Sequence, residues 1–253
     1  MGKQYKITSL LLILIITAGM FPRLSEARRA KGAVYYLEEY NVVGTELGRA
    51  SIDSEYSFLF PVSVSTQHVL AYLWSKNLIA EGILSKGLPL IYLDAHLDSF
   101  IGRTWTPQSS NWVRAVLDEK LCSSAALILP QWVYEDINMV YRVKLYDAAG
   151  EIRRLYQHSL SISDLEDLPA GKEQTPVVLS IDCDYFSNMG YPNHRTFPWE
   201  IEQEIAGIIN ILKDKGIKIA ALNIAISPGY TYLDQETFIR DQLLLAFSEY
   251  GKE

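Results

Sequence analysis

The chain has 253 residues, of which 49% are hydrophobic, 21% are charged and 11% are aromatic, and its formal net charge is −7. This composition excludes a disordered chain, a collagen-like repeat and a multi-span membrane protein, and the length suits a single domain. The acidic charge also argues against nucleic acid as a partner, because phosphate binding requires a basic surface. These features leave the oligomeric state open.

Residues 1–27 have the pattern of a secretory signal peptide. Two lysines precede an apolar run over residues 10–21, and the small residues Ser25 and Ala27 fit a cleavage site. The run is shorter than the roughly 20 apolar residues that a bilayer-spanning helix needs. We therefore expect residues 28–253 to form a single exported domain, either secreted, periplasmic or in the lumen of the secretory pathway. The alternative is an uncleaved N-terminal anchor, and only then would the protein contact a membrane.

Five short apolar runs predict β-strands. They cover residues 33–37, 88–93, 125–129, 177–181 and 217–226. Because the runs are continuous rather than alternating, they are typical of strands that are covered on both faces.

Amphipathic stretches lie between these runs and predict helices. They cover residues 66–85, 111–121, 198–215 and 234–250. The alternation of strands and helices predicts an α/β fold with a mostly parallel central sheet. Residues 140–173 are interpreted instead as a β-hairpin insertion followed by a polar connection.

The chain has only two cysteines, Cys122 and Cys183. We expect Cys122 to end the helix over residues 111–121, and we expect Cys183 to be a buried thiol because it lies in an apolar run. Export favours disulfides, but the sequence leaves the pairing of these two residues open.

Two acidic motifs directly follow two of the predicted strands. The motif DAHLD at residues 94–98 follows the run at 88–93, and the motif DCD at residues 182–184 follows the run at 177–181. In open α/β sheets, ligands bind outside the carboxyl ends of the strands. We therefore expect both motifs to line one site.

The spacing within each motif places ligand-type side chains together. Residues i and i+2 of a strand face the same side, so Asp94 and His96 can point at one centre, as can Asp182 and Asp184. Asp98 joins them if the chain stays extended. Four neighbouring carboxylates repel one another unless a cation neutralises them, and imidazole with carboxylate suits zinc, manganese or iron rather than calcium.

At these motifs the sequence resembles the arginase/deacetylase superfamily, whose ureohydrolases carry DAHxD and SxDxD at strand ends. The corresponding segments are DAHLD at 94–98 and SIDCD at 180–184. The closer likeness is to an uncharacterised arginase-like branch that also shows an SNW or GNW segment, a DxDxF segment and a final SPxYxxLxQ segment. The matches are Asn111-Trp112, residues 182–186 and residues 227–235. The resemblance implies a three-layer fold from about residue 33 to the end.

The resemblance also implies a metal centre. In the ureohydrolase pattern, two Mn2+ ions share a water or hydroxide, Asp94 and Asp182 bridge them, Asp98 completes one site, and His96 and Asp184 complete the other. In the deacetylase pattern, a single Zn2+ ion is bound by Asp94, His96 and one aspartate of the second motif.

Two further histidines are candidates. His68 lies 26 residues before Asp94, which fits the upstream histidine ligand of the family in spacing, although the usual Gly-Gly-Asp-His-Ser context is absent. The alternative for His68 is a structural role at a helix start. His194 follows the second motif in a loop, where it would shuttle a proton; the alternative is an exposed loop histidine.

Two departures from the family argue against arginase activity. The loop at residues 99–110 has no histidine, and the last predicted strand ends in SPGY at residues 227–230, where arginases carry a glutamate for the guanidinium group. The leading hypothesis is a metal-dependent hydrolase that cleaves an amide- or amidine-type C–N bond in a small-molecule or peptide-like substrate through a metal-activated water. The alternative is a non-catalytic, metal-stabilised module for ligand binding or interaction on the same fold.

Overall fold

The computed structural model describes residues 34–39, 47–53, 56–96, 98, 110–134, 154–157, 176–187, 189–190 and 195–252. The predicted signal peptide at residues 1–27 lies outside the described residues, and so does His194. Within the described part of the chain, no helix is both long and apolar enough to cross a membrane.

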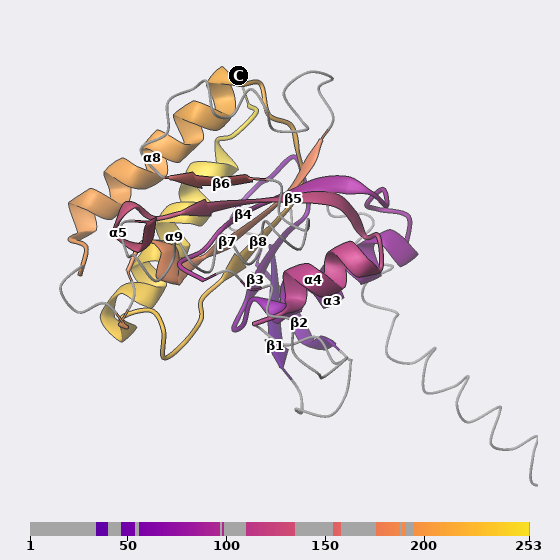
Figure 1. The fold of residues 1–253 in the computed structure, drawn as a ribbon, viewed down its shortest axis with the longest axis horizontal. Helices are drawn as coiled ribbons and strands as arrows, with labels where there is room; N and C mark the ends of the chain where they lie inside the picture. The colour runs from indigo at the N-terminus through magenta and orange to yellow at the C-terminus, as the bar shows by residue number, and fades with distance from the viewer. Residues whose placement is uncertain are drawn as a thin grey trace, which may run out of the picture.

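The centre of the structure is a single eight-stranded sheet. Its strands are β1 (Val34–Glu39), β2 (Leu47–Asp53), β3 (Val62–Ser65), β4 (Leu88–Leu93), β5 (Cys122–Leu129), β6 (Arg154–Gln157), β7 (Val177–Asp182) and β8 (Ile219–Ala225). Their spatial order is β2-β1-β3-β8-β7-β4-β5-β6 (Figure 1). All neighbours pair in parallel except β2, which runs antiparallel to β1 at one edge.

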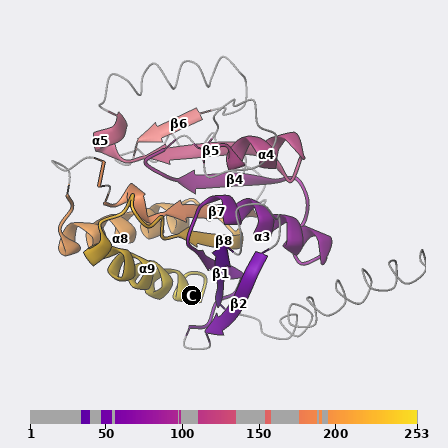
Figure 2. The ribbon, with the colours of Figure 1, turned by 90° about the horizontal axis from the view of Figure 1, so that it is seen from below.

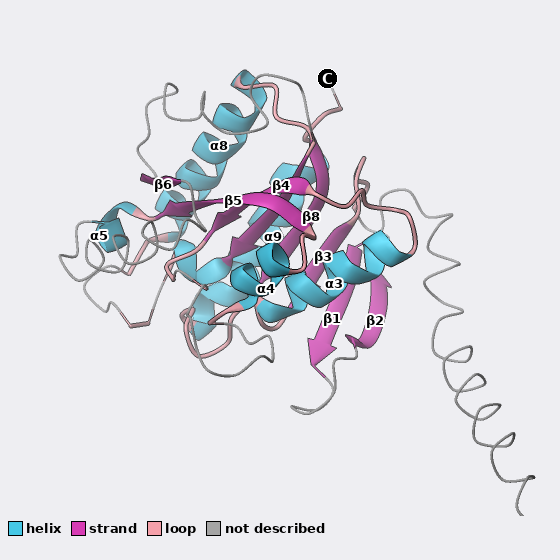
Figure 3. Cartoon of the chain, turned by 45° about the vertical axis from the view of Figure 1, so that its right-hand side comes forward, coloured by secondary structure: helices cyan, strands magenta, loops and turns pink. Residues whose placement is uncertain are grey.

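Helices cover both faces of this sheet, which gives three layers (Figures 2 and 3). The helices α3 (Val69–Ala80) and α4 (Trp112–Asp118) lie on one face, and α8 (Pro198–Asp214) and α9 (Leu233–Ser248) lie on the other. A short helix, α5 (Gln131–Tyr134), follows β5, and a 3-10 turn, η1 (Cys183–Tyr185), follows β7. The predicted fold class, a mostly parallel sheet between helical layers, is confirmed.

The side chains of the central strands alternate between two apolar layers. On β4, Ile91 and Leu93 pack in the layer that contains α8 and α9, whereas Leu90 and Tyr92 pack in the layer that contains α3 and α4. Because both layers exclude water, both sets of positions favour apolar residues. This double burial explains why the sequence shows continuous apolar runs rather than alternation.

The strands agree with the predicted runs in part, and the departures include both an edge strand and an interior strand. The run at residues 88–93 coincides with β4, whereas β2 and β3 were not predicted. Within the interpreted insertion at residues 140–173, the described strand is β6, which pairs in parallel with β5 at a sheet edge. The remainder of that segment lies outside the described residues.

The helix boundaries bring two corrections. The helix predicted over residues 66–85 is shorter, because α3 begins after β3 and ends at Ala80. The prediction that Cys122 ends a helix is wrong: α4 ends at Asp118, Lys120 turns the chain at a φ of +55°, and Cys122 begins β5. Both cysteines are buried and free, as expected for the Cys183 thiol.

Candidate metal centre

The candidate site lies where the connections of the sheet reverse direction. After β4 the chain runs through α4 to β5, its neighbour toward one edge of the sheet. After β7 it runs through α8 to β8, its neighbour toward the other edge. The two connections leave from adjacent strands and pass over opposite faces of the sheet. The carboxyl ends of β4 and β7 therefore lie where the connections diverge, and open α/β sheets bind ligands at such a position. Asp94 directly follows β4 and Asp182 ends β7.

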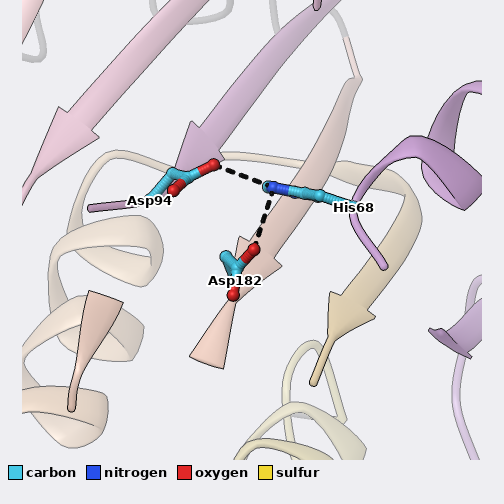
Figure 4. Close-up of side chains that lie close together, drawn as sticks. All are labelled: His68, Asp94 and Asp182. Carbon is cyan, nitrogen blue, oxygen red and sulfur yellow. Dashed lines mark hydrogen bonds and ion pairs between the residues drawn. The ribbon is translucent and has the colours of Figure 1, made fainter. Parts of the chain in front are cut away.

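His68 faces three aspartates from the start of α3. Its Nδ1 atom lies 2.9 Å from Oδ2 of Asp94, 3.3 Å from Oδ2 of Asp98 and 3.4 Å from Oδ2 of Asp182. Figure 4 shows the imidazole pointing at the carboxylates of Asp94 and Asp182 from the α3 side. The His68 side chain is only 1% exposed, so this group is closed to bulk water. His68, which was singled out by its spacing from the DAHLD motif, therefore contacts aspartates of that motif directly.

A second group lies on the other side of Asp94. Nδ1 of His96 is 2.8 Å from Oδ2 of Asp184 and 3.5 Å from Oδ1 of Asp94. The two aspartates are 1% exposed, whereas the His96 side chain is 37% exposed. The second group is therefore the side of the site that borders solvent.

Backbone N–H groups orient these carboxylates. The amide of His96 donates to Oδ1 of Asp94 at 2.7 Å, and the amide of Ala95 donates to Oδ1 of Asp184 at 3.2 Å. Asp182 caps η1 by accepting from the amide of Asp184 at 3.1 Å. The expected alternation along a strand is therefore wrong for both motifs. Asp94 and His96 follow the end of β4, Asp98 is not extended because its φ is +48°, and Asp184 lies on the η1 turn.

A buried polar chain supports His68 from behind. Nε2 of His68 is 2.7 Å from Oγ of Ser180, which donates at 3.3 Å to Oδ1 of Asn223. The Asn223 amide donates to Ser63 at 2.9 Å and to Ser65 at 3.2 Å. Our sequence reasoning missed Asn223, Ser63 and Ser65; the available signal was polar residues inside otherwise apolar strands.

The loop after β8 touches both groups. Oγ of Ser227 donates to Oδ2 of Asp182 at 2.6 Å, and the ring of Tyr230 meets His96 edge to face with 5.4 Å between ring centroids. Ser227 has a φ of +49°, which is uncommon for a residue other than glycine and is found at functional sites. The SPGY segment thus lies beside the candidate centre, although it supplies no carboxylate from residues 227–230.

The carboxyl groups of this cluster cannot all be ionised together. Burial and the charges of neighbouring aspartates raise the pKa of Asp98 to about 7 and raise the pKa values of Asp182 and Asp184. Burial also acts to raise the pKa of Asp94, but hydrogen bonds to the two histidines outweigh it and lower that pKa. Burial disfavours protonated His96, yet Asp184 and Asp94 raise its pKa to about 12. The raised pKa values of these carboxyls and of His96 both favour protonation, which offsets negative charge as a bound cation would.

The donor atoms also fit metal ions in number and spacing. Ligand atoms of His68, Asp94 and Asp182 all lie within 4.8 Å of one another, and so do those of Asp94, His96 and Asp184. Atoms bound at about 2.1 Å to one ion are separated by up to about 4.2 Å. The distances from the histidine to the aspartates, 2.9 and 3.4 Å in the first set and 2.8 and 3.5 Å in the second, lie below this limit. The two donor sets therefore fit two divalent ions that share Asp94, with Asp182 in only one of the two sets.

The predicted proton shuttle, His194, lies outside the described residues and stays a prediction. Its described neighbour Arg195 forms an ion pair with Asp234 and lies over the Tyr232 ring, with 5.0 Å from its Cζ atom to the ring centroid. Arg195 therefore belongs to the surface of the α9 start rather than to the two donor sets.

The three-layer fold of this chain, with a mostly parallel sheet between helices, is also found in two solved structures. Among solved structures, it is similar to formimidoylglutamase from Bacillus subtilis subsp. subtilis str. 168, with 14% identity, a TM-score of 0.53, and coverage of 75% of this chain and 60% of that one. It is also similar to a proposed agmatinase from Clostridium difficile, with 16% identity, a TM-score of 0.51, and coverage of 75% and 68%. The chain thus spans about three fifths of the length of the formimidoylglutamase. No protein-family model matches the sequence, and no curated protein matches it significantly.

Proposed function

We propose that this protein is a metal-dependent hydrolase that cleaves an amide- or amidine-type C–N bond in a small-molecule or peptide-like substrate. The observation that carries the proposal is the pair of His/Asp/Asp donor sets that share Asp94 at the carboxyl ends of β4 and β7. The likeness of fold to a formimidoylglutamase and a proposed agmatinase supports the same class of bond.

The protein's own residues would hold the ions and order the site. His68, Asp94 and Asp182 would hold one ion, with Asp98 beside them, and His96 and Asp184 would hold a second ion together with Asp94. Divalent ions bound there would lower the pKa of a water and polarise the scissile group. Because His96 is the most exposed of these side chains, substrate would approach from its side, past Tyr230.

The donor chemistry limits the choice of ion. Imidazole nitrogen with carboxylate oxygen suits Mn2+ or Zn2+ rather than Ca2+, which prefers oxygen ligands alone. Two donor sets with a shared aspartate favour a two-ion Mn2+ centre over a single Zn2+ ion.

The test is a hydrolysis assay with a panel of amides and amidines, with Mn2+ and Zn2+ supplied in turn and the bound metal quantified by plasma mass spectrometry. We expect about two equivalents of Mn2+ and turnover that a chelator abolishes. The Asp182→Ala variant should lose one of the two metal equivalents and lose turnover. Asp118→Ala, which removes an exposed aspartate of α4 paired with Arg114, should keep both equivalents and turnover.

Two results would separate the alternatives. Metal binding without turnover on any substrate, together with a lower melting temperature for Asp182→Ala, would support the non-catalytic module instead. Failure to bind either metal after reconstitution would reject the metal centre itself.

We further propose that the protein works outside the cytoplasm, on the strength of the leader-like residues 1–27. Mass spectrometry of the intact protein from an exporting host should show a chain that begins near residue 28. Recovery of the full-length chain in the membrane fraction would indicate an anchored form instead.

A further inference from the structure

Trp112 contacts two of the candidate ligands at once. Its indole Nε1–H donates to Oδ2 of Asp98 at 2.6 Å. Its ring lies against the His68 imidazole, with 4.6 Å between the ring centroids and a 42° angle between their planes. Neither contact follows from the metal-ligand pattern of the sequence, because Trp112 is not itself a ligand type.

Helix α4 holds Asp98 in an unusual backbone conformation. Asp98 has a φ of +48°, in the left-handed region that is uncommon for residues with a side chain. Two bonds from the first turn of α4 keep it there: the amide of Val113 donates to the Asp98 carbonyl at 3.1 Å, and Trp112 donates to its carboxylate. The start of α4 therefore fixes both the backbone and the side chain of Asp98.

Trp112 is itself firmly placed. It is 1% exposed, and it packs edge to face against Tyr92 of β4 with 5.8 Å between the ring centroids. An indole held this firmly loses little conformational freedom when it donates to a carboxyl oxygen. Its two contacts can thus restrain His68 and Asp98 before any ion binds.

We propose that Trp112 is a positioning residue of the His68 side of the metal centre: its N–H sets the orientation of Asp98 and its ring sets that of His68. This inference rests on the proposed function, since it assigns how one of the two ions is bound. Residues that orient metal ligands through hydrogen bonds typically change metal affinity by about 10- to 100-fold. The effect should fall on one ion only, because the indole contacts Asp98 and His68, and these two side chains lie on the side of the site away from His96 and Asp184.

The experiment compares Trp112→Phe with Trp74→Phe in Mn2+ titrations by isothermal calorimetry, with thermal melts of each variant in chelator. Trp74 is an equally buried tryptophan on α3, and its Nε1 has no hydrogen-bond partner among the described residues. Trp112→Phe should weaken one of two Mn2+ equivalents by about 10- to 100-fold and leave the other within about twofold. Trp74→Phe should change neither, although both variants lose a similar amount of packed volume.

Three outcomes would overturn the inference. They are unchanged affinity for both ions in Trp112→Phe, equal weakening of both ions, or the same weakening in Trp74→Phe. If wild-type protein binds no Mn2+ or Zn2+, the proposed function fails together with this inference. If wild-type protein binds two ions and Trp112→Phe binds them as tightly, only the inference about Trp112 fails.

A measurement on wild-type protein covers the case in which Trp112→Phe does not fold. In a nitrogen-15 spectrum, the Trp112 indole N–H should be protected from exchange with solvent and should shift when Zn2+ is added. Selective labelling of the tryptophans makes the signal assignable, since the chain has only five. An indole N–H that exchanges freely or does not respond to Zn2+ would overturn the proposed role.

Discussion

Glu204 has a pKa that is set by the surroundings of its side chain in the fold. It lies on α8 behind the second motif, where burial raises its pKa to about 7 although a hydrogen bond with Tyr185 acts in the opposite direction. The folded protein therefore holds this proton more tightly than the unfolded chain does. Because the unfolded chain releases it at lower pH, the contribution of Glu204 to the free energy of unfolding falls as pH rises from about 4.5 to about 7 and is level above that range.

The Glu204→Gln substitution should remove this pH dependence. We expect the variant to gain roughly 1–3 kcal/mol in free energy of unfolding relative to wild type between pH 5 and pH 8. Urea denaturation at both pH values measures the difference, and the titration of the metal-binding cluster cancels because both proteins share it. Glu202→Gln, at an exposed position of the same helix, is the control and should change little. Equal pH dependence in wild type and Glu204→Gln would contradict this account.

Single residues were predictable where chemistry and spacing coincide. Asp94 and His96 carry ligand atoms and directly follow a continuous apolar run, and His68 could be found through its distance along the chain from that motif. Asn223 and Trp112 could not be found in this way. Their roles depend on which strands are neighbours and on where α4 begins, and pairing between distant segments leaves no local pattern in the sequence.

At the scale of elements, α8 offers two glycines for comparison, one inside the helix and one just past its end. Gly216 ends the helix with a φ of +61°, and the amides of Gly216 and Ile217 donate to the carbonyls of Lys213 and Leu212, which is the Schellman pattern. Gly207 lies inside the same helix, and an added Cβ would meet nothing within 4 Å.

The same substitution should have opposite effects at these two glycines. Gly216→Ala should lower the free energy of unfolding by about 1 kcal/mol, because it forces a side chain into the left-handed region. Gly207→Ala should raise it by about 0.5–1 kcal/mol, because alanine favours the helix interior. Chemical denaturation of both variants measures the two changes. Destabilisation by Gly207→Ala would mean that its surroundings are tighter than the structure shows.

Whole elements were predictable where burial coincides with a continuous apolar run. The run at residues 88–93 coincides with β4 because both faces of that central strand are apolar and its ends are marked by polar residues. The predicted helix at 66–85 was too long because apolar periodicity continues into the turn after Ala80. β3 was missed because Ser63 and Ser65 break its apolar pattern. Those serines belong to the polar chain behind His68, so the strand that the sequence did not predict is one that supports the candidate site.

At the scale of the whole molecule, the topology concentrates acid in the interior. Two adjacent parallel strands deliver four aspartates to the point where the connections reverse, and Asp94, Asp182 and Asp184 are almost fully buried there. Buried carboxylates repel one another and lose their hydration. Both effects lower the free energy of unfolding unless protons or cations compensate the charge. An ion that binds only the folded chain should therefore stabilise the entire structure.

Thermal melts in chelator and in Mn2+ test that coupling. An ion at 100 times its dissociation constant adds about 2.7 kcal/mol to the free energy of unfolding, and in a chain of this size about 1 kcal/mol shifts Tm by roughly 2–4 °C. We expect Tm to rise by roughly 5–10 °C for each bound ion. Asp182→Ala should lose the part of the Mn2+-dependent rise that comes from one ion, since it removes a donor of the His68 set, while Asp118→Ala should keep the whole rise. Equal Tm values in chelator and in saturating Mn2+ would show that the buried acid is compensated by protons alone.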